Sequence, residues 1–90
     1  MSVRVRLPAL FADRIGGVGV VDTTAPTVEA ALREVGRSYP ALATLVLASD
    51  GRVNPVIVVF LNDQQLPADR LDAPVRAGDE IDIVPAIEGG

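Results

Sequence analysis

The chain has 90 residues, a formal net charge of −4, and neither histidine nor cysteine. This inventory excludes disulfides, zinc and iron-sulfur sites, thiol nucleophiles and Ser-His-Asp catalysis. The acidic balance argues against nucleic acid and against an anionic membrane surface as partners, because both require a basic footprint.

The length predicts a single domain over residues 1–90 with one thin core. Hydrophobic residues make up 49% of the chain but aromatic residues only 3%, so that core must consist of Val, Leu, Ile and Ala. No apolar run approaches the ~20 residues of a membrane span, and no signal-peptide segment follows the basic start. We therefore expect a cytoplasmic protein. All basic residues are arginine, so the chain has no side-chain amine for isopeptide attachment to itself.

The N-terminal segment predicts a hairpin with a long loop. Residues 3–7 alternate apolar and charged side chains, which is typical of a half-buried strand. Pro8 ends its regular pairing, residues 9–17 connect, and residues 18–22 form the second strand. The alternation puts the two arginines on the face opposite the apolar residues: Arg4 and Arg6 against Val3, Val5 and Leu7.

One helix follows the hairpin. Thr27 is a suitable N-cap, and Pro40 ends the helix. Between and just beyond them, apolar residues recur at helical spacing, namely Val28, Ala31, Leu32, Val35, Tyr39 and Leu42. Residues 42–55 predict no more than one helical turn and then a turn at Asp50-Gly51.

The C-terminal half predicts two further strands. Residues 56–62 are β-branched and almost wholly apolar, as in a strand with two covered faces or with an apolar outer face. Residues 66–79 are irregular, with Leu66, Leu71 and Val75 as anchors. Residues 80–85 form the last strand, with Ile81 and Ile83 inward and Asp82 and Val84 outward.

This order predicts an α+β protein of the β-grasp class, with a mixed four- to five-stranded sheet packed on one main helix. A strand that follows a hairpin and a helix pairs most simply in parallel with the first strand, by a right-handed crossover. The last strand should lie between the first and third. A ferredoxin-like split βαβ fold is the alternative, and it would need a second full helix between residues 40 and 55. The residues expected to be buried together are Val3, Val5, Leu7, Val28, Leu32, Val35, Ile57, Val59, Leu61, Ile81 and Ile83.

Three polar motifs carry little chemistry. The glycines of residues 16–19 lie between two strands and open no helix, so a flexible loop is favoured over a phosphate cradle. Asp79, Glu80 and Asp82 are interpreted as a solvated turn and not as a cation site, since only two of them share a face. Asp13 and Arg14 have no nucleophile near them in the sequence. We predict no metal site.

Three segments resemble the ubiquitin-like sulfur carriers: "LND" at 61–63, "TVEAALREV" at 27–35 and "APVRAGDEIDIVPAIEGG" at 73–90. That family includes the small subunit of molybdopterin synthase, the thiamine-pathway carrier and the CysO carrier of cysteine biosynthesis. "LPALFADRIGG" at 7–17 and "PAIEGG" at 85–90 are most similar to CysO-like carriers. Glu88 departs from the small or neutral residue usual before the two glycines.

The resemblance implies that Gly90 is the site of adenylation and of the thiocarboxylate. An E1-like activating enzyme would use ATP to adenylate the Gly90 carboxylate, and a sulfur-consuming biosynthetic enzyme would take the sulfur. The domain itself would bind no cofactor, and it would be a carrier and not an enzyme. Ile87, Glu88 and Gly89 would thread into the partner, since glycine has no Cβ and permits unusual backbone angles. We expect residues 88–90 to be exposed and mobile.

The same alternation predicts a partner surface. If Val59 and Leu61 face the helix, Val58 and Phe60 face outward, next to Val84 on the last strand. We expect these three residues and Pro85 to form an apolar patch at the root of the tail, flanked by Arg4 and Arg6. A dimer interface, or a cover by residues 41–55, is the alternative use of this face. A small subunit of molybdopterin synthase and an inert β-grasp interaction module are the alternative functions.

Overall fold

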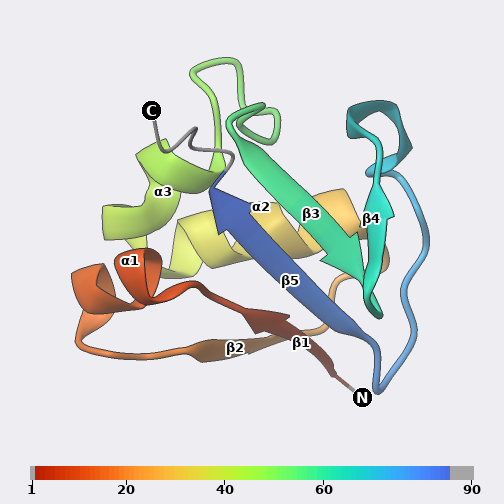
Figure 1. The fold of residues 1–90 in the computed structure, drawn as a ribbon, viewed down its shortest axis with the longest axis horizontal. Helices are drawn as coiled ribbons and strands as arrows, with labels where there is room; N and C mark the ends of the chain where they lie inside the picture. The colour runs from red at the N-terminus through yellow and green to blue at the C-terminus, as the bar shows by residue number, and fades with distance from the viewer. Residues whose placement is uncertain (1, 86–90) are drawn as a thin grey trace.

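A computed structural model of the chain describes residues 2–85. Its elements are β1 (Val3–Arg6), α1 (Ala9–Ala12), β2 (Val20–Thr23), α2 (Val28–Ser38), α3 (Pro40–Val46), β3 (Ile57–Leu61), β4 (Gln64–Leu66) and β5 (Glu80–Pro85). Short 3-10 turns follow α1 at Asp13–Ile15 and β4 at Ala68–Arg70. Figure 1 shows the sheet lying across α2, with α3 beside that helix.

The five strands form one mixed sheet in the order β2-β1-β5-β3-β4. β5 lies between β1 and β3, as predicted, and pairs with β1 in parallel and with β3 antiparallel. The parallel partner of β1 is therefore the last strand and not β3, the strand that directly follows the helices. The predicted β-grasp class is confirmed. α3 is too short to be the full second helix that a ferredoxin-like fold requires.

The main helix begins and ends where the sequence predicts. The Thr27 side-chain oxygen accepts a hydrogen bond from the backbone N–H of Ala30 at 3.1 Å, which caps the first turn of α2. Pro40 begins α3 instead of continuing α2, since proline has no N–H to donate in a helix interior. At Gly36 a Cβ would lie 3.0 Å from Leu47 Cδ1, so glycine permits the close packing of α2 and α3.

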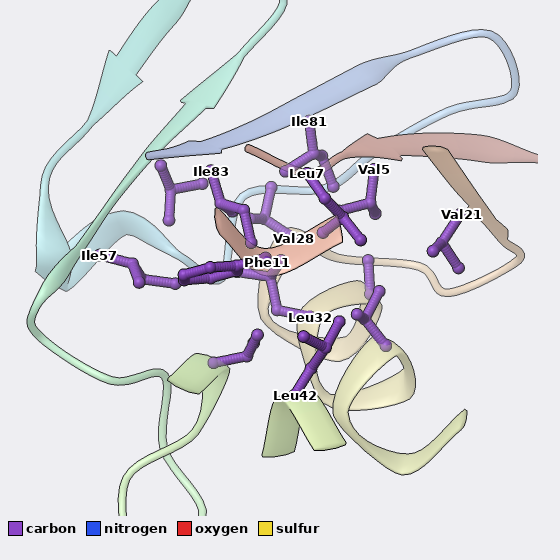
Figure 2. Packing of buried hydrophobic residues seen from close by; sticks show 14 of the residues in the cluster. Val5, Leu7, Phe11, Val21, Val28, Leu32, Leu42, Ile57, Ile81 and Ile83 are labelled. Atoms are coloured by element: carbon purple, nitrogen blue, oxygen red, sulfur yellow. The ribbon is translucent and has the colours of Figure 1, made fainter. Parts of the chain in front are cut away.

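One core fills the space between the sheet and the helices. Ten of the eleven residues predicted for it are buried; Leu61 is only half-buried, because the chain turns away immediately after it. The prediction missed Phe11, which is 3% exposed on α1, and Val46 of α3, which is fully buried. Figure 2 shows the Phe11 ring among the same buried side chains as Ile57 and Leu32.

Three segments have more regular structure than the sequence predicted. Residues 9–15 form α1 and a 3-10 turn that seats Phe11, residues 40–46 form α3 with Leu42 and Val46 in the core, and residues 64–66 form β4. The glycines at 16 and 17 have φ angles of 75° and 91° and lead the chain out of the 3-10 turn, which explains them without a ligand. Among the described residues, no helix is long and apolar enough to cross a membrane.

Candidate functional site

The predicted tail site falls outside the described residues. Ile87, Glu88, Gly89 and Gly90 all follow Pro85, the last residue of β5. The structure therefore describes the strand that leads to the tail and the surface around it.

The face of the sheet away from α2, here called the open face, carries the predicted partner residues. Val58 lies directly opposite Val84 in the β3–β5 register, and Phe60 lies opposite Asp82. Val84 is 44% exposed, whereas Val58 and Phe60 are half-buried. The structure thus brings Val58, Phe60 and Val84 together, with Pro85 half-buried at the end of the strand. At 44% exposure Val84 is not covered by residues 41–55, whereas several residues of the 48–55 segment line a hollow that Val58 also borders.

The two predicted arginines occupy different positions on this face. Arg6 lies beside Asp82 in the β1–β5 register, at the border of the apolar residues, whereas Arg4 lies beside Glu80, one step further from Val84. Arg6 bridges two acids: its Nη1 lies 3.4 Å from Glu80 Oε1 and its Nε lies 3.5 Å from Asp82 Oδ1. Its charge is therefore already engaged within the domain, which the sequence pattern did not indicate.

Residues 61–63 ("LND") and 78–80 ("GDE") of the two resembling segments are joined by a network of hydrogen bonds, here called the lock. Asn62 and Asp63 form the β3–β4 turn with φ angles of 48° and 71°, the left-handed pair that a two-residue hairpin requires. The Asn62 side chain donates to Asp79 Oδ1 at 3.1 Å and accepts from the Glu80 backbone N–H at 2.9 Å. Asp79 Oδ2 accepts from the backbone N–H of Arg76 at 2.8 Å. These residues hold the start of β5 against the hairpin, so their role is structural.

The lock has a pH dependence with a definite sign. The hydrogen bond from the Arg76 backbone, and then that from the Asn62 side chain, hold the pKa of Asp79 below its ordinary value. A carboxyl whose pKa is lowered on folding stabilises the fold above its unfolded pKa of about 3.9, and this contribution is lost as the pH falls through the folded pKa.

We expect the stability of Asp79→Asn to fall less with decreasing pH than that of the natural protein. The measurement is the urea midpoint as the pH is lowered from about 6 to below the unfolded pKa of Asp. Asp72→Asn, at an exposed position outside the lock, is the matched control. Identical pH profiles for Asp79→Asn and the natural protein would show that the lock does not depend on this charge.

No group of three or more His, Cys, Asp or Glu side chains within residues 2–85 could hold a metal ion. Asp79 and Glu80 are instead taken up by the lock and by Arg6. A hollow lies between α2, the 48–55 segment and β4. Of the predicted partner residues, only Val58 lines it.

The chain thus combines a β-grasp sheet, a hairpin joined by hydrogen bonds to the start of β5, and a sequence that ends in Gly89-Gly90. A model of the ThiS family matches residues 5–90. The chain belongs to the ThiS family. It is a ubiquitin-like sulfur carrier protein of the ThiS and MoaD type, as the resemblance implied.

Two comparisons cover the chain almost completely at moderate identity. A protein of Archaeoglobus fulgidus, provisionally named a sulfur carrier protein, is 32% identical, and the alignment spans 100% of both chains. The crystal structure of SAMP1 from Haloferax volcanii shares 29% identity over 100% of both chains, with a TM-score of 0.84.

The third comparison is the crystal structure of the BexX/CysO complex of Amycolatopsis orientalis. It contains a chain with 27% identity and a TM-score of 0.78, covering 98% of this chain and 99% of that one. The two solved structures are similar to this chain in sequence as well as in fold.

Proposed function

We propose that the chain carries sulfur as a thiocarboxylate on Gly90 and donates it to a biosynthetic enzyme. The observation that carries this proposal is the family match that runs through the two terminal glycines. A carboxylate is a poor electrophile, so the carrier needs activation: an E1-like enzyme transfers AMP from ATP to the Gly90 carboxylate and releases pyrophosphate. The resulting acyl-AMP has a good leaving group.

Sulfur then replaces AMP. Sulfide attack on the carbonyl carbon forms the C–S bond, breaks the bond to AMP and leaves the thiocarboxylate. If the donor is a protein persulfide, its terminal sulfur forms an acyl disulfide, and a thiol must supply two electrons to release the thiocarboxylate. The chain has no cysteine, so any such thiol belongs to a partner.

Partner enzymes supply the catalysis in this scheme. The chain has no histidine, cysteine or lysine, so it offers no imidazole, thiol or side-chain amine of its own. The proposed partners are the adenylating enzyme and a sulfur-consuming enzyme. The solved complex of a similar chain, CysO with BexX, supports binding to a protein partner. Cysteine or another sulfur-containing metabolite is the proposed destination, and molybdopterin synthesis is the alternative.

A second candidate role rests on the similarity to SAMP1, a small archaeal modifier protein by name. In that role the Gly90 carbonyl would be transferred to an amine of another protein instead of to sulfur. Because the chain has no lysine, it could not build chains through its own side-chain amines. The products of the two roles differ in mass, so one experiment separates them.

The test is intact-mass spectrometry of the untagged protein purified from its native host. We expect a species heavier by the replacement of one oxygen with sulfur, and alkylation of its thiocarboxylate should map to Gly90. A larger adduct through an amide bond at Gly90 would favour the modifier role. An unmodified mass, combined with no ATP-pyrophosphate exchange in the presence of the activating enzyme, would contradict both and favour an inert module.

The open face supplies a prediction about partner binding. We expect Phe60→Ala to weaken binding to the activating or the sulfur-consuming enzyme at least about tenfold, because a large aromatic at the centre of an interface can contribute about 2 kcal/mol or more. Calorimetric titration with each enzyme measures this effect. Val20→Ala is the control, since Val20 is exposed on β2 at the far edge of the same sheet. Normal binding of Phe60→Ala to both enzymes would remove Phe60 from the partner surface.

A further inference from the structure

The open face carries a shallow hollow where β1 ends before β5. β1 ends at Arg6 and the chain leaves through Leu7 and Pro8, whereas β5 continues to Pro85. The hollow that results has an apolar side and an acidic side. The apolar side consists of Pro8, Phe60 and Val84, and the acidic side consists of Asp63 and Asp82.

Negative charge is in excess at this hollow. Arg6 is the cation among its lining residues, and its guanidinium lies between Glu80 and Asp82, at 3.4 Å and 3.5 Å. Asp63 adds a further carboxylate from the β3–β4 turn. Arg6 pairs with two of these acids, and Arg4 lies beside Glu80, so the three carboxylates still outnumber the two arginines at this part of the open face and a further cation would be attracted there.

Asp82 is the least exposed of the three acids: its side chain is 25% exposed and that of Glu80 34%, while Asp63 is exposed. Burial among its neighbours raises the pKa of this carboxyl; the Arg6 charge opposes the rise, and the charges of Glu80 and Asp63 add to it. A second cation at this point would offset the desolvation of Asp82 and the repulsion from the other two acids.

We propose that this hollow receives a basic side chain, arginine or lysine, from the partner protein that binds the open face. The aliphatic stem of that side chain lies along Phe60 and Val84, and its cationic end reaches the carboxylates of Asp82 and Asp63. Long basic side chains bury their methylene groups on apolar surface while keeping the charge at a polar rim, so the two sides of the hollow match the two parts of such a side chain. A charge-assisted bond to a carboxylate gives both orientation and specificity. This inference rests on the proposed carrier function, whose activating enzyme is the partner.

The binding test uses the full chain and the activating enzyme encoded by the same genome. We expect Asp82→Asn to weaken binding about tenfold and Asp63→Asn several-fold. Both losses of affinity should be smaller at high salt, because salt screens the attraction that speeds association of the natural pair. Asp22→Asn is the control: it removes an equal charge from an exposed position of the same face on β2 and should change affinity less than about twofold.

A charge reversal identifies the partner's residue. Asp82→Lys should abolish measurable binding, and reversing one lysine or arginine of the enzyme to glutamate should restore it, with coupling that a double-mutant cycle detects. Circular dichroism of each variant checks that the fold is kept. Natural affinity for Asp82→Asn, or failure of every basic residue in the enzyme's contact surface to restore Asp82→Lys, would overturn the proposal.

A partner-independent measurement separates this inference from the carrier function. We expect N-acetyl-arginine amide to shift the backbone amide signals of Phe60, Asp82 and Val84 in a saturable way, and N-acetyl-citrulline amide, which is neutral, to leave them unchanged. If the natural chain is adenylated while Asp82→Asn is bound equally well, only the hollow's role fails. If the natural chain is not adenylated at all, the carrier function fails. Self-association that Asp82→Asn abolishes would assign the hollow to a second copy and overturn the proposal.

Discussion

Deletion of Gly90 is expected to abolish ATP-pyrophosphate exchange with the activating enzyme and to leave thermal unfolding almost unchanged. Removing one residue shortens the reach of the chain by about 3.5 Å. A displacement of even about 1 Å can slow a positioned reaction about a hundredfold, so the shortened carboxylate should not react. Among the described residues, the last core side chain is Ile83, so Gly90 lies well beyond the core in the sequence.

Exchange activity and melting temperature are measured on the same preparation. We expect the melting temperature to change by less than about 4 °C, the smallest shift that about 1 kcal/mol produces in a domain of this size. Gly90→Ala is the matched variant, because it keeps the length and adds only a Cβ; it should retain more exchange activity than the deletion. A large loss of stability on deletion would mean that the tail is structural, and full activity would remove Gly90 from the reaction.

Truncation of Leu32 to alanine is expected to lower the free energy of unfolding by about 2–5 kcal/mol. Leu32 is fully buried on α2, within the cluster that joins the sheet to both longer helices. Alanine favours the helix, so the loss would come from packing and not from helix propensity. For a domain of 90 residues this is a large share of a typical total stability of about 5–15 kcal/mol.

Urea unfolding followed by circular dichroism measures this change. Arg37→Ala is the control on the same helix, since Arg37 is exposed, and it should change stability by no more than about 0.5 kcal/mol. A destabilisation of less than about 1 kcal/mol for Leu32→Ala would show that the cluster tolerates the cavity by collapsing around it.

The motif residues divide into two roles that the sequence alone did not separate. Asn62 and Asp79 belong to the segments that most resemble the sulfur carriers, yet their hydrogen bonds tie the hairpin to the start of β5. Their role is to support the strand that leads to the tail. The chemical role proposed for the family's terminal glycines rests on Gly90, which has no side chain to contribute.

The strands and the main helix were predictable because each has a local period that its burial requires. Val3, Val5 and Leu7 alternate with Arg4 and Arg6, and the structure buries the first three and exposes the arginines. The apolar residues of α2 recur at helical spacing, and Thr27 caps the helix. A local pattern is enough here, because each of these segments presents one continuous face to the core.

The short elements were not predictable in this way. α1 has four residues and β4 has three, too few to show a period, and both depend on contacts with distant parts of the chain. Phe11 belongs to the core only because α1 is placed where its ring reaches residues such as Ile57. Such elements are stabilised by tertiary packing more than by their own propensity.

The candidate site also combines features that the local sequence specifies with features that depend on distant contacts. The sequence by itself determined the terminal glycines, the lack of histidine, cysteine and lysine, and the outward direction of Val58, Phe60 and Val84, since these follow from residue identity and strand alternation. Only the tertiary structure decided that Arg6 spans Glu80 and Asp82 and that a hollow with an apolar and an acidic side lies beside Phe60. Those features depend on the register between β1, β5 and β3. The β1–β5 register joins residues more than 70 positions apart, which no local pattern specifies.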